Sequence, residues 1–176
     1  MTDPTQKIWI SWWIALSSLI CIWDALFCLL RPYSLPGNSL SMFWGPYKHY
    51  VKFDLSYGME HTTGFINAQS LGNLMESTLN FGYLYLVHKV GTKESRRTAS
   101  LVAVISTIMT GYKTVIFVLQ EYYSGFSSIR HNPFSEIFMK WIFPQSLWIF
   151  VPFYLTSLFG NHLLSLASGL PVEKAL

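Results

Sequence analysis

Two carboxylates stand within stretches of sequence that are otherwise apolar, Asp24 near the N-terminus and Glu76 in the middle of the chain. An acidic side chain at the centre of a bilayer costs roughly 2.5–3.5 kcal/mol on insertion scales, so such a residue faces a protein interior or a cavity. A neutral acid beside an ionised one is the pairing that proton transfer requires. We therefore predict that Asp24 and Glu76 point into one buried chamber, where one is the general acid and the other the general base.

Polar residues recur at helical spacing in each of four apolar stretches, which places them on one face of each helix. The four rows are Ser17, Cys21, Asp24 and Cys28; Gln69, Asn73, Glu76 and Asn80; Thr107, Thr110, Thr114 and Glu121, with Lys113 beside them; and Trp141, Gln145 and Trp148. A bundle that turns these rows inward has a cavity with apolar walls and a polar floor. The residues that we expect to contact a substrate there are Asn73, Asn80, Tyr112, Lys113, Glu121 and Trp141.

The elements that carry these rows are predicted to be membrane-spanning helices. The chain has 176 residues, of which 51% are hydrophobic, 17% aromatic and 12% charged, whereas a soluble domain carries about 25% charged residues. A helix needs about 20 apolar residues to cross the hydrocarbon core of a bilayer. The stretches of that length are residues 8–30, 64–89, 99–122 and 137–160. We predict an all-α protein with a single domain, residues 1–176, that forms a bundle of four transmembrane helices.

The connection between the first two helices, residues 31–63, is long and rich in aromatic residues. Aromatic rings are typical of the membrane–water interface, so we expect this segment to lie at the lumenal surface. Basic residues on the side of the termini are Lys7, Lys89, Lys93, Arg96, Arg97 and Lys174, and those on the other side are Arg31, Lys48, Lys52, Arg130 and Lys140. The positive-inside rule then predicts that both termini are cytosolic.

The sequence shows no pattern typical of a metal, phosphate or nucleic-acid site. The histidines are scattered, no metal-ligand spacing occurs, and there is no glycine-rich phosphate loop or internal repeat. The net charge of +3 fits a bias of basic residues toward cytosolic loops better than a nucleic-acid surface. We therefore expect no cofactor, no metal and no nucleic acid, and a lipophilic small molecule that reaches the protein through the membrane lipid.

Three blocks of sequence carry a resemblance to a known family. The blocks are Tyr47-Lys48-His49-Tyr50 followed by Asp54, Ser56 and Tyr57; Met75-Glu76-Ser77-Thr78; and Leu119–Phe126 followed by Asn132-Pro133, Gln145–Trp148 and Pro152. In this order and spacing they resemble the emopamil-binding-protein (EXPERA) family of four-span membrane proteins. That family contains sterol Δ8–Δ7 isomerases and the sigma-2 receptor.

The resemblance implies a fold and a chemistry. It implies a four-helix bundle in the endoplasmic reticulum membrane and allows a homodimer. The family's isomerases use acids on spans one and two, whose positions match Asp24 and Glu76, with supporting residues on span four that match Gln145 and Trp148. A tryptophan face suits a carbocation through cation–π attraction. The resemblance therefore implies that Asp24, Glu76, Gln145 and Trp148 are the catalytic residues.

The chain departs from the family's isomerases at several positions. Ile20 stands where they carry His, Leu79 where they carry Thr, and Lys113 where no cation is expected. We therefore predict an isomerase or cyclase for another sterol, terpenoid or polyene, of the kind that related proteins act on in natural-product pathways. Two alternatives stay open: a non-catalytic protein that binds sterols or amines, like the sigma-2 receptor, and a structural subunit in which Lys113 pairs with Asp24 or Glu76.

Overall fold

The computed structural model describes residues 3–59 and 64–168, and every regular element within these residues is helical. The helices are α1 (Ile8–Leu29), α2 (Tyr47–Phe53), α3 (Gly64–Tyr85), α4 (Lys93–Tyr123), α5 (Phe134–Ile137) and α6 (Phe143–Ser168). The short segments are the 3₁₀ turns η1 (Pro4–Gln6), η2 (Ser41–Trp44) and η3 (Leu55–Tyr57) and the π-helical η4 (Leu86–Val90) and η5 (Phe138–Ile142). The all-α prediction is therefore confirmed. Lys174, which entered the charge count, lies outside the described residues.

Four long helical segments occupy the four predicted stretches, and the last two are longer than predicted. α4 begins at Lys93, because the Thr92 side chain accepts a hydrogen bond from the backbone N–H of Ser95 at 3.1 Å and caps the helix. Lys93, Arg96 and Arg97, which precede the predicted stretch 99–122, therefore belong to the first turns of α4. The final segment, α5 with η5 and α6, runs from Phe134 to Ser168.

Three of the segments are long and apolar enough to cross a membrane, namely Ile8–Leu29, Lys93–Tyr123 and Phe134–Ser168. α3 is not one of them, since residues such as Asn73 and Glu76 lower its hydropathy. The structure is thus compatible with a membrane protein and contains three of the four predicted spans as apolar helices.

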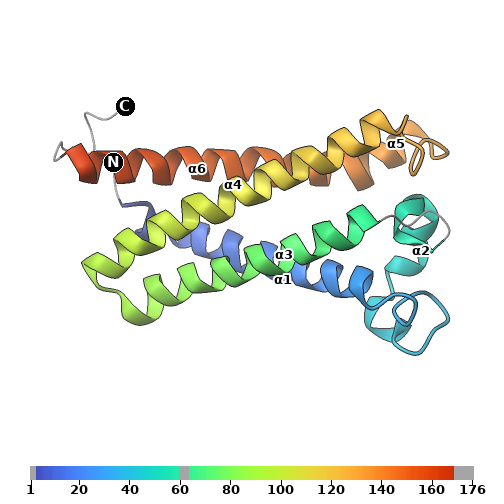
Figure 1. Ribbon diagram of the computed structural model, residues 1–176, viewed down its shortest axis with the longest axis horizontal. Coiled ribbons are helices and arrows are strands. Elements are labelled where there is room, and N and C mark those ends of the chain that lie inside the picture. The colour runs from blue at the N-terminus through green and yellow to red at the C-terminus, as the bar shows by residue number, and fades with distance from the viewer. Residues whose placement is uncertain (1–2, 60–63, 169–176) are drawn as a thin grey trace.

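The long helices form a bundle in which α1 packs on α3, α3 on α4, and α4 on α6. In Figure 1 the α1–α3 pair and the α4–α6 pair lie close together at the end that holds η1 and the last turns of α6, and they diverge toward α2. The closed end is filled by apolar side chains from all four helices: Ile10, Ile14, Tyr83, Val87, Ala99, Ala103, Leu155, Leu158 and Phe159. Ala99 and Ala103 are small enough for the backbone of α4 to approach its neighbours. This apolar cluster therefore fills one end of the bundle, whereas the helix pairs lie further apart at the other, open end.

The segment between α1 and α3 folds over the open end, and residues 31–59 are called the aromatic connection below. Tyr33 and Phe43 are exposed, whereas Trp44, Tyr47 and Tyr57 are buried, at 6%, 7% and 9% exposed. They pack around Phe27 of α1, whose ring lies 4.1 Å from that of Tyr47. The aromatic connection is thus part of the protein core.

Arg31 anchors the aromatic connection to the end of α1. Its guanidinium donates to the carbonyl oxygens of Ser56 and Tyr57, each at 3.1 Å, and to Asn67 Oδ1 at 2.8 Å. We expect Arg31→Met to lower the free energy of unfolding by about 1–3 kcal/mol, because buried carbonyl groups lose their donor. Thermal unfolding in detergent micelles measures the change, and Lys48→Met, at an exposed lysine of the same segment, is the matched control. Equal midpoints for the two variants would show that aromatic packing alone holds the segment.

Candidate functional site

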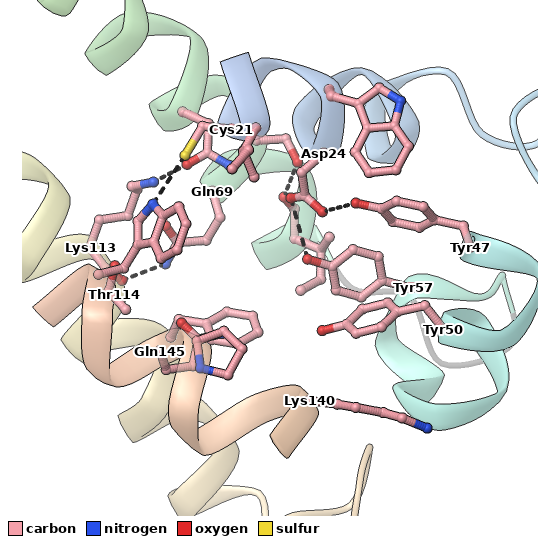
Figure 2. A pocket seen from close by; sticks show the side chains of 18 of the residues that line it. Cys21, Asp24, Tyr47, Tyr50, Tyr57, Gln69, Lys113, Thr114, Lys140 and Gln145 are labelled. Atoms are coloured by element: carbon pink, nitrogen blue, oxygen red, sulfur yellow. Dashed lines mark hydrogen bonds between the residues drawn. The ribbon is translucent and has the colours of Figure 1, made fainter. Parts of the chain in front are cut away.

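A cavity of about 410 Å³ lies at the open end of the bundle, beside the aromatic connection. Side chains of α1, α3, α4, α6 and the aromatic connection form its wall. Its volume is within the range of pockets that bind small organic ligands, about 300–1,000 Å³. Figure 2 shows that polar groups gather at two ends of the cavity, with Asp24 at one end and Lys113 at the other. The apolar part of the wall includes Ile20, Ile66, Phe117, Pro144 and Trp148.

Asp24 enters the cavity from α1 and is held there by the aromatic connection. Its Oδ1 accepts a hydrogen bond from the hydroxyl of Tyr47 at 2.5 Å, and its Oδ2 accepts one from Tyr57 at 3.3 Å. Burial, together with the charge of Asp24, raises the pKa of both tyrosines, so their hydroxyl groups stay protonated and remain donors. Two donors on an acceptor-only group fix the Asp24 carboxylate in one orientation.

Lys113 reaches the cavity from α4, and residues of α3 hold it. Its Nζ lies 3.3 Å from Glu76 Oε2 and donates to Asn73 Oδ1. Gln69 Nε2 donates to the backbone carbonyl of Lys113 at 3.2 Å. Glu76 is 2% exposed and does not line the cavity. The two acids predicted to share a chamber are therefore linked indirectly, because Lys113 stands between Glu76 and the cavity that Asp24 enters.

Gln145 and Trp148 both line the cavity at the start of α6, where the resemblance placed them. Trp148 Nε1 donates to Cys21 Sγ of α1 at 3.3 Å. The preceding turn is widened, because Pro144 has no N–H to offer to the carbonyl of Lys140 and the chain adopts the π-helical η5 there.

Two of the expected contact residues lie away from this cavity on the long helices. Asn80 is buried and donates to Ser18 Oγ at 2.9 Å, so its amide joins α3 to α1. Tyr112 is 63% exposed. Consecutive residues of a helix point about 100° apart, so Tyr112 turns outward when Lys113 turns inward. Neither Asn80 nor Tyr112, which were predicted to contact a substrate, lines this cavity.

Glu121 and Trp141 are buried but are not part of the cavity wall either. Trp141 packs with Phe53 and Ile129 in a separate apolar cluster. Glu121 is 1% exposed, and its charge acts on Asp54 of the aromatic connection. The protein interior, rather than this cavity, therefore surrounds both residues.

Asp54 makes stability depend on pH. It is fully buried, and its Oδ1 accepts from the backbone N–H and the hydroxyl of Ser56 at 3.0 and 2.6 Å. Burial, with smaller contributions from the charges of Glu121 and Asp24, raises the pKa of Asp54 from 3.8 to about 6. Between these values the folded protein keeps a proton that the unfolded chain has lost, so stability falls as pH rises and is level above about pH 6.

We therefore expect the thermal midpoint of the protein in micelles to fall between pH 4.5 and pH 6.5, by roughly the cost of ionising a buried acid. Asp54→Asn keeps an acceptor for Ser56 but carries no charge, so its midpoint should fall less over the same interval. Midpoints measured at several pH values compare the two proteins. Parallel curves would mean that other groups produce the dependence.

Tyr47, Tyr57 and Gln69 are among the cavity residues that were not assigned to the site from the sequence. Tyr47 and Tyr57 belong to the first block of the family resemblance, and that block was the available signal. The block does not show how residues 31–59 fold back on α1, and that fold brings both hydroxyl groups to Asp24. Gln69 belongs to the polar row of α3 and could have been inferred from its helical spacing.

The arrangement offers a proton acceptor and a cation at opposite ends of one apolar space. Among residues 3–59 and 64–168, no group of three His, Cys, Asp or Glu side chains is placed to hold a metal ion. Comparison of the chain with protein-family models, curated proteins and solved structures returned no match. The geometry of the cavity is therefore the basis for assigning a function.

Proposed function

We propose that the protein is a membrane enzyme that isomerises or cyclises a lipophilic sterol, terpenoid or polyene without a cofactor, a substrate class that the resemblance to the emopamil-binding-protein family suggests. The observation that carries the proposal is the cavity, which has apolar walls and is lined by both Asp24 and Lys113. Proton transfer within a bound molecule needs a base and a countercharge held at fixed positions around it. The volume of the cavity suits one substrate molecule of this class.

In the proposed reaction Asp24 removes a proton from one carbon of the substrate and returns it to another carbon. A double bond moves as a result, and the oxidation state of the molecule does not change. Lys113, whose charge Glu76 balances, stabilises the negative charge that develops as the proton leaves. Gln145 and Trp148 form the wall that folds the substrate into a reactive shape, which for a polyene also favours ring closure.

The proposal includes α3 and η4 as a fourth membrane crossing. The Glu76 and Asn80 side chains of α3 are 2% and 5% exposed, so the protein rather than lipid surrounds them. An even number of crossings agrees with the two described ends, which lie together in Figure 1 and are joined by the 3.6 Å contact between Asp3 and His162. We propose that this end is cytosolic and that the aromatic connection faces the lumen of the endoplasmic reticulum.

A non-catalytic binding protein is the second candidate function. The Asp24 end of the cavity favours it, because a carboxylate surrounded by the rings of Tyr47, Tyr50 and Tyr57 also suits the ammonium group of a lipophilic amine. This candidate needs neither Lys113 nor Gln145 in the wall.

Product analysis separates the two candidates. Membranes that contain the protein are incubated with Δ8-sterols and with polyene terpenoids, and the products are identified by mass spectrometry. Conversion that is lost both in Asp24→Asn and in the double variant Lys113→Met with Glu76→Gln, while each variant stays folded, supports the enzyme. Saturable binding of a lipophilic amine with no conversion of any substrate in the panel supports the binding protein instead.

A further inference from the structure

The α3 helix is shaped to receive the whole side chain of Lys113. A Cβ atom at Gly72 would lie 3.1 Å from Cδ of Lys113, so the absence of a side chain there makes room for the lysine stem. One residue further along α3, Asn73 accepts from the ammonium group, and Glu76, one helical turn on, lies 3.3 Å from it. These three residues form a slot that fixes Nζ at the cavity wall.

The slot leaves hydrogen-bonding capacity on the ammonium group. A lysine Nζ carries three N–H donors, and among the described residues its acceptor is Asn73, with Glu76 as its ion-pair partner. Lys113 lines the cavity and keeps 19% of its side chain exposed. A donor is therefore available to a molecule in the cavity, at the end opposite Asp24.

The charges around the cavity determine which acceptor suits this donor. Glu76 balances the charge of Lys113, and the Asp24 carboxylate adds a negative charge to the same cavity. The other lysine in the wall, Lys140, pairs with Glu136 at 2.6 Å. The negative charge of Asp24 would repel a ligand carboxylate, and the positive charge of each lysine in the wall is already balanced. A neutral oxygen would not be repelled.

We propose that the substrate is a neutral lipophilic carbonyl compound whose C=O oxygen accepts a hydrogen bond from Lys113. The inference rests on the proposed function. It narrows the substrates from sterols, terpenoids and polyenes in general to those that are ketones or aldehydes. A carbonyl at the Lys113 end withdraws electrons along a conjugated chain, so a proton at the Asp24 end becomes easier to remove. The negative charge then collects on the oxygen that Lys113 contacts.

Ligand binding tests the proposal without requiring turnover. Three radiolabelled probes with one skeleton are compared on the protein in micelles: 5α-androstane, its 3-alcohol and its 3-ketone. We expect the ketone to bind at least about tenfold more tightly than the hydrocarbon, because it gains a hydrogen bond to a charged donor. Equal binding of ketone and hydrocarbon, or tighter binding of the alcohol than of the ketone, would overturn the proposal.

Matched variants locate the effect. The double variant Lys113→Met with Glu76→Gln removes the ion pair as a unit, and in it the ketone and the hydrocarbon should bind equally. Gly72→Ala, which crowds the lysine stem, should reduce the preference while keeping both charges. Lys140→Met removes the other lysine of the wall. Because Lys140 is paired with Glu136, this variant should still bind the ketone more tightly than the hydrocarbon. A preference that survives in the double variant would place the carbonyl elsewhere.

The outcome also separates this inference from the proposed function. If the ketone preference depends on Lys113 but no carbonyl substrate is converted, the inference about binding stands and the proposal that the protein is an enzyme is wrong. Conversion of hydrocarbon or alcohol substrates with no ketone preference keeps the enzyme and removes the inference.

Discussion

Replacing Asp24 by Asn is expected to lower turnover by roughly 10²–10⁴-fold, the contribution of a positioned proton-transfer group. The amide keeps the size of the side chain and can still accept from Tyr47, but it cannot take a proton from carbon. The measurement is the initial rate of product formation in membranes with equal amounts of folded protein. Binding of the substrate should change little, since the wall and Lys113 are unaltered.

Two further variants make this test specific. Glu121→Gln makes the same chemical change at a buried carboxylate outside the cavity wall, so its rate should match that of the unaltered protein. Tyr47→Phe removes one donor to the Asp24 carboxylate and leaves the base in place, so it should change the pH–rate profile more than the maximal rate. A fully active Asp24→Asn protein would exclude Asp24 as the base.

Hydropathy and residue spacing predicted the helices well because those signals are local. The predicted ends failed at Lys93, where a cap by Thr92 rather than hydropathy starts α4. The aromatic connection could not be placed, because its burial depends on contacts such as those of Phe27 with Tyr47, which join distant parts of the chain. A ring-rich segment between spans has the same composition whether it lies in the headgroup layer or folds over a bundle.

The candidate site was predictable as a set of faces and not as a set of contacts. Asp24, Lys113 and Gln145 line one cavity, as the polar rows implied. Thr107 belongs to the same kind of row, yet its hydroxyl bonds with that of Thr156, so here the polar row joins α4 to α6. Spacing cannot distinguish a polar group that faces a cavity from one that a neighbouring helix satisfies. For the same reason, the sequence left open whether Lys113 pairs with Asp24 or with Glu76.

The pairing of Lys113 with Glu76 predicts a large and unequal effect of the two single substitutions on stability. Lys113→Met leaves the Glu76 carboxylate, which is 2% exposed, with no cation, and removing one partner of a buried ion pair costs about 3–5 kcal/mol. At about 2–4 °C per kcal/mol for a protein of this size, the thermal midpoint should fall by about 6–20 °C. Glu76→Gln should lower the stability less, because the Lys113 ammonium that remains still donates to Asn73 and still lines the cavity.

The double variant decides whether the loss comes from the ion pair or from packing. Lys113→Met combined with Glu76→Gln leaves no buried charge, so it should be more stable than Lys113→Met alone. A double-mutant cycle of thermal midpoints in one detergent gives the coupling energy between the two residues. If the two single losses simply add, the ion pair does not couple α3 to α4. A double variant that is as stable as the unaltered protein, or more stable, would mean that the cation is retained at a cost in stability, as expected of a residue whose ammonium serves the cavity.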